Sequence, residues 1–368
     1  MVKDAKEVLL LCEAYGEVGA GLYVLEEAAR LERHVTICVS GNADLYRFFQ
    51  EVNTGFYNNE LNVVPLTLFQ SEAPAQSGLK RFFTMAADIC RVRSYYGRLY
   101  WEHMRGFWGA EVYFFTRYFT PNNYYYLRRL ARDNQIVLMS VIDWEKDLDT
   151  SPWQNVRHLL RLVKLKLQYG WDMTYARLPH STFEYIKEGF IQRWVGRVYA
   201  LAETEKRVGK LPVEKYGAAF HSDCRVMFFD QPLVGSGRVP DAEQYRRELE
   251  AIFGVIGRYF KETEIGVKYH PADRKERSIT GVGRVIEDWI PGEMLYSPSI
   301  KLYLGISSGA LANVENGLVV SLLDLVTFKD AGAKLFIREN LLARSRSQVL
   351  FPQTIEELED IVRGVKEG

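Results

Sequence analysis

Residues 7–40 read EVLLLCEAYGEVGAGLYVLEEAARLERHVTICVS, and this stretch decides the fold. Residues 7–12 are dominated by a continuous apolar run, which is typical of a strand buried on both faces. Residues 22–30 then combine helical spacing with strong helix formers, and residues 34–40 are again apolar. The order of strand, glycine-containing turn, helix and strand predicts a βαβ unit, the building block of an open, doubly wound parallel sheet.

The turn between the first strand and the first helix contains Gly16, Gly19 and Gly21. Their spacing does not match GxGxxG, and no acidic residue closes the second strand near position 40, so a dinucleotide site is disfavoured. Two interpretations stay open. The turn forms a loop in which Glu13, Gly16 and Gly19 contact a sugar acceptor, or the glycines serve tight turns and close packing of helix against strand.

Composition excludes several classes of protein. The 368 residues carry 47 basic and 47 acidic side chains, so the chain lacks the surplus positive charge that nucleic-acid binding draws on. The four cysteines are far apart and form no CxxC pair, which predicts neither a zinc cage nor a disulfide framework. The N-terminal apolar run is too short for a secretion signal or a membrane span, so we expect a cytoplasmic protein.

Aromatic residues make up 13% of the chain, and two segments alternate them with arginine. These segments are residues 91–98 and 124–130. Such a pattern can bind an anionic polymer or an acidic sugar through stacking and cation–π contacts. The alternative is that the rings fill a core and the arginine stems cover its edge.

The β/α alternation continues through the chain. Further strands are expected at residues 111–115, 135–142, 225–229, 264–269, 283–286, 301–306 and 319–323. Helices are expected at 241–259 and 354–365, with helical character across 155–208 and at 292–296.

These elements predict an α/β protein with two Rossmann-like, doubly wound domains facing a cleft. We place an N-terminal, acceptor-side domain at residues 1–215 and a C-terminal, nucleotide-binding domain at residues 216–350. Residues 351–368 form a final helix. The sequence shows no fixed-period repeat and does not determine an oligomeric state.

Polar residues follow two strands of the second domain where each strand ends. His270 and Pro271 follow one strand, and Ser307, Ser308 and Gly309 follow another and open a helix. An imidazole, two hydroxyls and the first free N–H groups of a helix can together bind a phosphate without a metal. The alternatives are a structural histidine and a plain serine N-cap.

The motifs Asp-Gln-Pro-Leu at 230–233, Lys-Tyr-His-Pro at 268–271, Ile-Pro-Gly-Glu at 290–293 and Gly-Ile-Ser-Ser at 305–308 occur in that order. In this order they resemble the C-terminal halves of bacterial sialyltransferases and polysialyltransferases with a GT-B fold, especially glycosyltransferase family 52. The resemblance covers roughly residues 225–325.

This resemblance implies an inverting, metal-independent glycosyltransferase. Such an enzyme moves a sialic acid, or a related nonulosonic acid, from a CMP-activated donor to a glycan acceptor and needs no further cofactor. The resemblance assigns His270, Ser307 and Ser308 to the cytidine monophosphate and Glu293 to its ribose. We also expect His270 to be a catalytic residue, which protonates the leaving phosphate. The flanking donor-side positions are Gln231, Lys268, Pro271 and Gly309.

The family also carries an acidic motif in its N-terminal domain, whose carboxylate removes the acceptor proton. Here residues 141–145 read Val-Ile-Asp-Trp-Glu, without the family's adjacent acid pair or glycine. We expect Asp143 to be the catalytic base, with Glu145 or Glu13 as substitutes; the alternative for Asp143 is a helix cap.

Other functions and contacts stay open. A GT-B transferase could use CMP-Kdo or a UDP-sugar instead, and a degenerate relative could bind nucleotide or glycan without turnover. The basic and aromatic stretch 157–171 fits a peripheral helix at the inner face of the membrane, or an ordinary interdomain helix.

Overall fold

The structure is a computed structural model that divides into two compact units, Met1–Leu211 and Pro212–Gly368. It describes residues 6–70, 78–115, 121–141, 166–168, 190–209, 211, 216, 224–270, 277 and 279–368. The division lies close to the boundary that we expected at 215/216, and the C-terminal helix belongs to the second unit.

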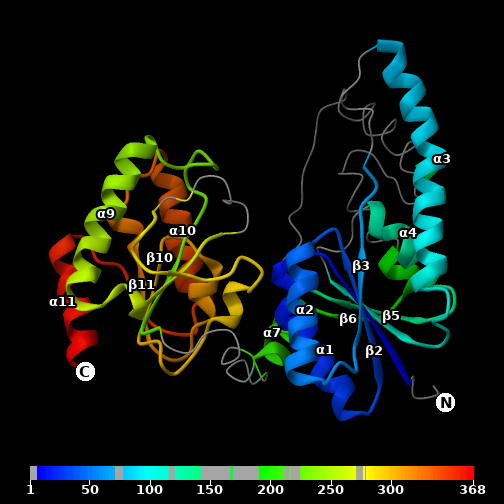
Figure 1. Cartoon of the computed structure of the whole chain (residues 1–368), viewed down its shortest axis with the longest axis horizontal. Coiled ribbons are helices and arrows are strands. Elements are labelled where there is room, and N and C mark those ends of the chain that lie inside the picture. Colours follow the sequence, from blue (N-terminus) through cyan, green and yellow to red (C-terminus); the bar gives the residue numbers. More distant parts are fainter. Residues whose placement is uncertain are drawn as a thin grey trace. The chain divides into compact units, whose positions relative to one another are not determined.

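The first unit contains a parallel six-stranded sheet with the strand order β3-β2-β1-β4-β5-β6 (Figure 1). Its strands are β1 Glu7–Cys12, β2 His34–Ser40, β3 Asn62–Leu66, β4 Glu111–Phe115, β5 Gln135–Met139 and β6 Val195–Tyr199. The winding reverses between β1 and β4, and ligands of open α/β sheets bind at the carboxyl ends of the strands at such a switch point.

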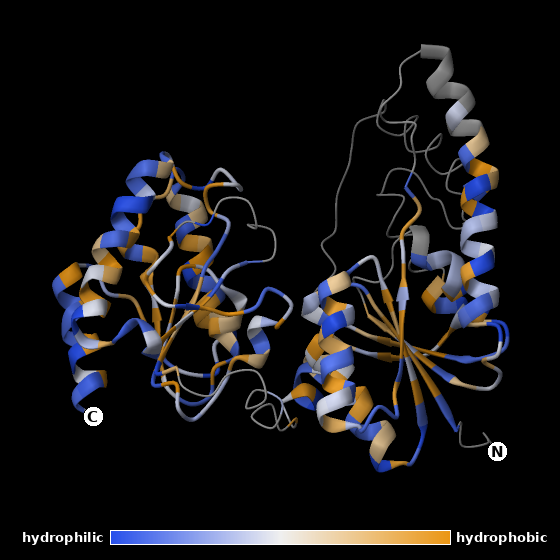
Figure 2. Cartoon of the chain, in the orientation of Figure 1, coloured by the Kyte–Doolittle hydropathy of each residue, from blue (hydrophilic) through white to orange (hydrophobic). Residues whose placement is uncertain are grey.

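The helices of the first unit pack along this sheet. They are α1 Val18–Arg30, α2 Ala43–Phe56, α3 Gly78–His103, α4 Pro121–Leu130 and α7 Leu201–Val208, with the 3₁₀ turn η1 Tyr15–Glu17 before α1. In Figure 2 apolar residues concentrate on the strands, which agrees with the nearly complete burial of β1 and β2.

The alternating tyrosine and arginine segments belong to the core of the first unit. Tyr96 and Tyr124 to Tyr126 are at most 5% exposed and lie in one apolar cluster with the strands. The Arg129 guanidinium lies 3.6 Å from the centre of the Tyr125 ring. The core-packing interpretation of these rings is therefore confirmed, and these tyrosines offer no stacking platform for a glycan.

The second unit contains another parallel six-stranded sheet, with the order β12-β11-β10-β7-β8-β9. Its strands are β7 Val226–Phe229, β8 Ile265–Lys268, β9 Arg284–Val285, β10 Leu302–Gly305, β11 Leu318–Ser321 and β12 Val349–Leu350. Numbered within its own unit, this is the same winding as in the first sheet, with the switch point between β7 and β10. The predicted α/β class with two Rossmann-like sheets is thus confirmed.

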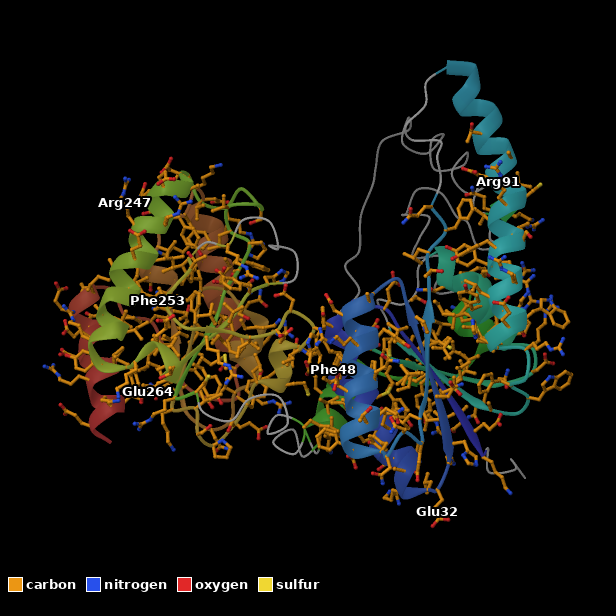
Figure 3. The ribbon with its side chains drawn as sticks, viewed as in Figure 1. Glu32, Phe48, Arg91, Arg247, Phe253 and Glu264 are labelled. Carbon is orange, nitrogen blue, oxygen red and sulfur yellow. The ribbon has the colours of Figure 1, made fainter. Side chains whose placement is uncertain are left out.

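Helices and short turns complete the second unit. They are α9 Ala242–Tyr259, α10 Ala331–Arg344 and α11 Ile355–Glu367, and the 3₁₀ turns η5 Glu262–Glu264, η7 Gly292–Met294, η8 Gly309–Asn313 and η9 Leu322–Leu325. Asp241 caps α9 by accepting a 2.6 Å hydrogen bond from the Gln244 N–H. The predicted apolar stripe of α9 is buried. Its Phe253, labelled in Figure 3, packs edge-to-face on Phe228, with 5.0 Å between the ring centres.

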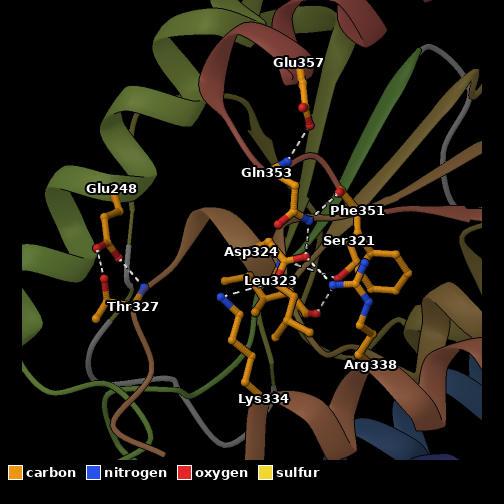
Figure 4. Close-up of polar contacts among 11 residues, drawn as sticks. Glu248, Ser321, Leu323, Asp324, Thr327, Lys334, Arg338, Phe351, Gln353 and Glu357 are labelled. Atoms are coloured by element: carbon orange, nitrogen blue, oxygen red, sulfur yellow. Dashed lines mark hydrogen bonds and ion pairs between the residues drawn. The ribbon is translucent and has the colours of Figure 1, made fainter. Parts of the chain in front are cut away.

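A polar cluster around Asp324 fastens α10 and the chain before α11 to the end of β11 (Figure 4). The carboxylate accepts hydrogen bonds from Arg338 at 2.7 Å and from the Gln353 amide at 2.6 Å. The Lys334 ammonium lies 3.3 Å from its other oxygen. Because Asp324 is only 10% exposed, these partners compensate the desolvation of its charge.

One expectation about local structure was wrong. Residues 195–199 form β6 rather than part of the helical region expected across 155–208. Three of its five residues are exposed, because β6 is an edge strand and contributes little to the core. Most of the stretch 157–171, the predicted peripheral helix, lies outside the described residues.

Within the described ranges, no helix is both long enough and apolar enough to cross a bilayer. The four cysteines are free thiols, and the described residues contain no group of three or more acidic, histidine or cysteine side chains that could hold a metal ion.

Candidate functional site

The carboxyl edge of the second sheet brings the predicted donor segments together. Gly305, Phe229 and Lys268 lie in one row across β10, β7 and β8. Neighbouring strands are about 4.8 Å apart, so the segments that carry Ser307 and His270 leave this edge roughly 10 Å apart. The segment after β7 lies between them, and the switch point is next to it. This spacing suits a small anionic group held from both sides.

The turn after β10 is pressed closely against the end of β7. A Cβ atom at Gly305 would lie 3.1 Å from the Phe229 carbonyl oxygen and 3.2 Å from the Leu311 side chain. Gly309, by contrast, is exposed and has no heavy atom within 4 Å of the position of a Cβ. The first glycine therefore permits close packing, and the second leaves the backbone of the turn open to a ligand.

The two serines of this turn have different surroundings. Ser308 is buried and caps η8, where its Oγ accepts a 3.3 Å hydrogen bond from the Ala310 N–H. Ser307 is only partly buried. The helix that we expected after the two serines is a 3₁₀ turn of five residues, so the helix dipole at this turn is small. Ser308 thus shapes the turn, and Ser307 is the hydroxyl more accessible to a ligand.

The segment that carries Glu293 packs directly on the serine turn. A Cβ at Gly292 would lie 3.5 Å from both the Ala310 Cβ and the Phe229 ring. The Tyr296 hydroxyl donates a 2.7 Å hydrogen bond to the Ala310 carbonyl oxygen. The described structure therefore brings together the segments of Glu293 and Ser307, which the sequence motifs had linked.

His270 is partly buried at the end of β8. Burial, and secondarily the charge of Lys268, lower the pKa of its imidazole. The ring is accordingly neutral at neutral pH, and can donate one hydrogen bond from one nitrogen. Pro271, which follows it, lies outside the described residues.

Two further donor-side residues contact the protein's own backbone. The buried Lys268 ammonium donates hydrogen bonds of 3.0 Å each to the carbonyl oxygens of Glu287 and Asp288. The Gln231 amide folds back to the Asp230 carbonyl oxygen at 3.0 Å. Lys268 therefore ties the chain after β9 to the sheet, and both side chains donate hydrogen bonds to backbone carbonyl oxygens of the protein.

Burial of Lys268 predicts a dependence of stability on pH. Desolvation lowers the pKa of Lys268 from 10.5 to about 8. Between these values the unfolded chain binds the proton and the folded chain does not, so the free energy of unfolding should fall as the pH falls from 10.5 to about 8. The full change is about 3 kcal/mol. Urea unfolding across this window measures it.

The control for this prediction is the Lys268→Met variant. It should be less stable overall, because two buried carbonyl groups lose their donor, yet it should lack this component of the pH slope. Equal slopes for the two proteins would contradict the assigned pKa.

In the first unit, Glu13 lies directly after β1, at the switch point of the sheet. Its N–H donates to the Glu17 carboxylate at 2.6 Å, and its carbonyl oxygen accepts from the Asn42 amide at 3.1 Å. Its own carboxylate accepts a 2.5 Å hydrogen bond from the Asn123 amide. Glu17 and Asn123 are fully buried, whereas Glu13 is only partly buried. The Glu13 carboxylate is therefore held in one orientation at this edge.

Of the three acids that we considered as bases, only Glu13 lies in the part of the chain that the structure describes. Asp143 and Glu145 fall outside the described residues. The strand expected to end at residue 142 ends at Met139.

The glycines after β1 serve different purposes. Gly16 is exposed in the turn η1, next to Glu13. A Cβ at Gly19 would lie 3.0 Å from a methyl group of Val208 on α7, and one at Gly21 would lie 3.2 Å from the Phe49 ring. Gly19 thus lies within α1 at a contact with α7, as the packing interpretation expects.

The contact at Gly19 predicts a stability effect. The Gly19→Val substitution should destabilise the protein by about 1–3 kcal/mol, because the added methyl groups collide with Val208. Urea unfolding measures the change, and Val208→Ala in the same chain should restore part of it. A fully stable Gly19→Val protein that no longer binds acceptor would instead support the acceptor interpretation.

Sequence reasoning missed the two asparagines that hold Glu13. Asn42 carried a recognisable signal, because an asparagine before a helix is a common N-cap, and here it accepts a 3.0 Å hydrogen bond from the Leu45 N–H. Asn123 carried none, since its partner lies 110 residues away in the sequence.

Comparisons with known proteins were made at the level of sequence and of structure. No family model matches the chain, and no curated protein matches its sequence. Among solved structures, Arabidopsis thaliana UGT89C1 complexed with UDP is 12% identical, with a TM-score of 0.40, over 98% of this chain and 90% of that chain. A putative UDP-N-acetylglucosamine 2-epimerase from Listeria monocytogenes is 12% identical, with a TM-score of 0.45, over 100% of this chain and 89% of that chain.

A third structure, the spinosyn rhamnosyltransferase SpnG complexed with thymidine diphosphate, is 12% identical, with a TM-score of 0.38, over 98% of this chain and 92% of that chain. With TM-scores below 0.5, these similarities carry no functional argument.

Proposed function

We propose that the protein is an inverting, metal-independent glycosyltransferase of the GT-B type, which transfers a sialic acid or a related nonulosonic acid from a CMP-activated donor to a glycan. One observation carries the proposal. The segments of His270 and Ser307 leave the second sheet at one edge around its switch point, and the segment of Glu293 packs on the turn after β10. The sequence motifs assign all three residues to the donor.

The donor side would hold the nucleotide through hydrogen bonds. The Ser307 hydroxyl and the open backbone at Gly309 would donate to the phosphate from one side, and neutral His270 from the other. The Glu293 carboxylate would accept from the ribose hydroxyls. Negative charge grows on the phosphate as the bond between the sugar and the phosphate breaks. Hydrogen-bond donors that already point at the phosphate therefore stabilise the transition state more than the ground state.

On the acceptor side, Glu13 would act as the general base. Its carboxylate takes the proton of the attacking hydroxyl, whose oxygen forms a bond to the anomeric carbon. The bond from that carbon to the phosphate oxygen breaks, its electron pair stays on the CMP, and the configuration inverts. Orientation of Glu13 by Asn123 supports this role over a freely rotating surface acid.

Binding of free nucleotides tests the donor assignment. Isothermal titration of the purified chain with CMP, UMP, UDP and thymidine diphosphate should give the tightest binding for CMP. The last two nucleotides represent donors other than a CMP-sugar. Preference for UDP or thymidine diphosphate would replace the proposed donor by another nucleotide sugar.

Turnover tests the enzymatic assignment. CMP-sialic acid incubated with the protein should release CMP, and faster when a glycan acceptor is present. CMP binding without any release of CMP from the donor would indicate a non-catalytic nucleotide-binding protein.

A further inference from the structure

A hollow of about 370 Å³ lies at the amino-terminal edge of the first sheet, at the end of β1 opposite to Glu13. Six side chains form most of its rim, namely Glu7, His34, Trp101, Glu102, His103 and Arg105. Its volume falls in the range of small-molecule sites. The length of β1 separates it from Glu13 by roughly 20 Å, so it is distinct from the proposed base and its surroundings.

Trp101 gives this hollow an open aromatic face. It stands near the C-terminal end of α3, where that helix lies against the sheet (Figure 1), and 61% of its surface is exposed. The Arg105 guanidinium lies over the ring, 4.9 Å from its centre, so a ligand would stack on the opposite face. The indole ring is a large, flat apolar surface that a ligand can stack on. A flat apolar face beside polar groups suits the face of a pyranose ring.

The polar rim matches the hydroxyl groups of a sugar. Glu7 and His34 are neighbours in the first row of β1 and β2, and both are exposed. The Glu102 carboxylate lies 3.9 Å from the His103 imidazole. Carboxylates accept from hydroxyls, and imidazoles donate or accept, so the rim can bond several hydroxyls at once.

The charge of the rim selects among glycans. Glu7 and Glu102 bring two negative charges, of which Glu102 lies 4.0 Å from the Arg98 guanidinium, and Arg105 brings a positive charge. The rim therefore has no surplus of positive charge that would attract a polyanionic glycan, whereas an uncharged glycan needs none.

We propose that this hollow is a second glycan-binding site, which takes a neutral oligosaccharide with one pyranose ring stacked on Trp101. The inference is independent of the proposed transferase activity, since it uses none of the residues assigned to donor or base. The site would anchor a glycan chain on the first unit at a distance from Glu13.

The test uses the purified full chain with maltohexaose, cellohexaose and chitohexaose as neutral probes and oligosialic acid as the anionic probe. Binding is followed by isothermal titration up to millimolar concentrations, where weak glycan binding is still measurable. At least one neutral probe should bind. Trp101→Ala should weaken that binding at least about tenfold, the effect of losing one well-formed contact.

Trp108→Ala is the matched control, because Trp108 is 74% exposed but does not line the hollow. It should leave glycan binding unchanged, and so should Glu13→Gln, even where that variant loses transfer. Failure of all three neutral probes to bind, binding of the anionic probe alone, or equal affinity of wild type and Trp101→Ala would each overturn the proposal. Because Trp101 is largely exposed, its loss should not unfold the chain, and circular dichroism verifies this.

Discussion

Replacing Glu13 with glutamine should lower glycosyl transfer by about 10²–10⁴-fold, the usual contribution of one general base. Glutamine preserves the size of the side chain, and its carbonyl oxygen can still accept from the Asn123 amide. It cannot take up a proton from the acceptor. The CMP affinity should stay within about twofold of wild type, because the base acts on the acceptor and not on the nucleotide. Initial rates and nucleotide titration measure the two effects separately.

Two companion variants sharpen this experiment. Glu27→Gln changes an exposed carboxylate on α1 in the same way and should retain full activity. Asp143→Asn tests the base that the motif comparison favours. Loss of transfer in Asp143→Asn with full activity in Glu13→Gln would assign the base to Asp143 and would contradict the role proposed for Glu13.

Replacing His270 with alanine should lower kcat/KM by about 10²–10⁴-fold, because one donor to the developing phosphate charge is lost. Part of the loss should appear as weaker binding of CMP, since His270 is proposed to bond the phosphate in the ground state too. Steady-state kinetics with CMP-sialic acid and titration with CMP divide the effect between the two.

A conservative variant and a surface control accompany this substitution. His270→Gln keeps a neutral hydrogen-bond donor, and should recover part of the activity if a neutral imidazole is what the phosphate meets. Arg284→Ala removes an exposed charge from the edge strand β9 and should leave kinetics unchanged. Undiminished transfer by a folded His270→Ala protein would remove His270 from the mechanism.

Strands buried on both faces were predictable from the sequence, whereas of the edge strands in the two described sheets only β9 was expected, at residues 283–286. The apolar runs at residues 7–12 and 34–40 became β1 and β2 with the expected bounds, because central strands of a parallel sheet must be apolar throughout. By contrast, β6 is mostly exposed and contains Gly196, so its residues resemble the surrounding charged sequence. Similarly, β3 contains Pro65, a residue tolerated only at an edge, and no pattern indicated it.

For the candidate site, sequence reasoning identified positions better than environments. The ends of β8 and β10 were correctly placed, so His270 and Ser307 were expected at one edge. The sequence did not predict the burial of Lys268 or its hydrogen bonds to two backbone carbonyl groups, because a lysine that ends an apolar strand is usually exposed. The pairing of Glu13 with Asn123 depends on how distant segments pack, and no local pattern reports it.

Because β6 lies near the end of the first unit's sequence, it determines where the chain can be truncated to give the first unit alone. A fragment that stops before Val195 would leave one side of β5 unpaired, and an open row of N–H and C=O groups promotes self-association. It would also lack α7, which fills the contact beside Gly19. A fragment intended for expression on its own should therefore extend through Leu211, where the first unit ends.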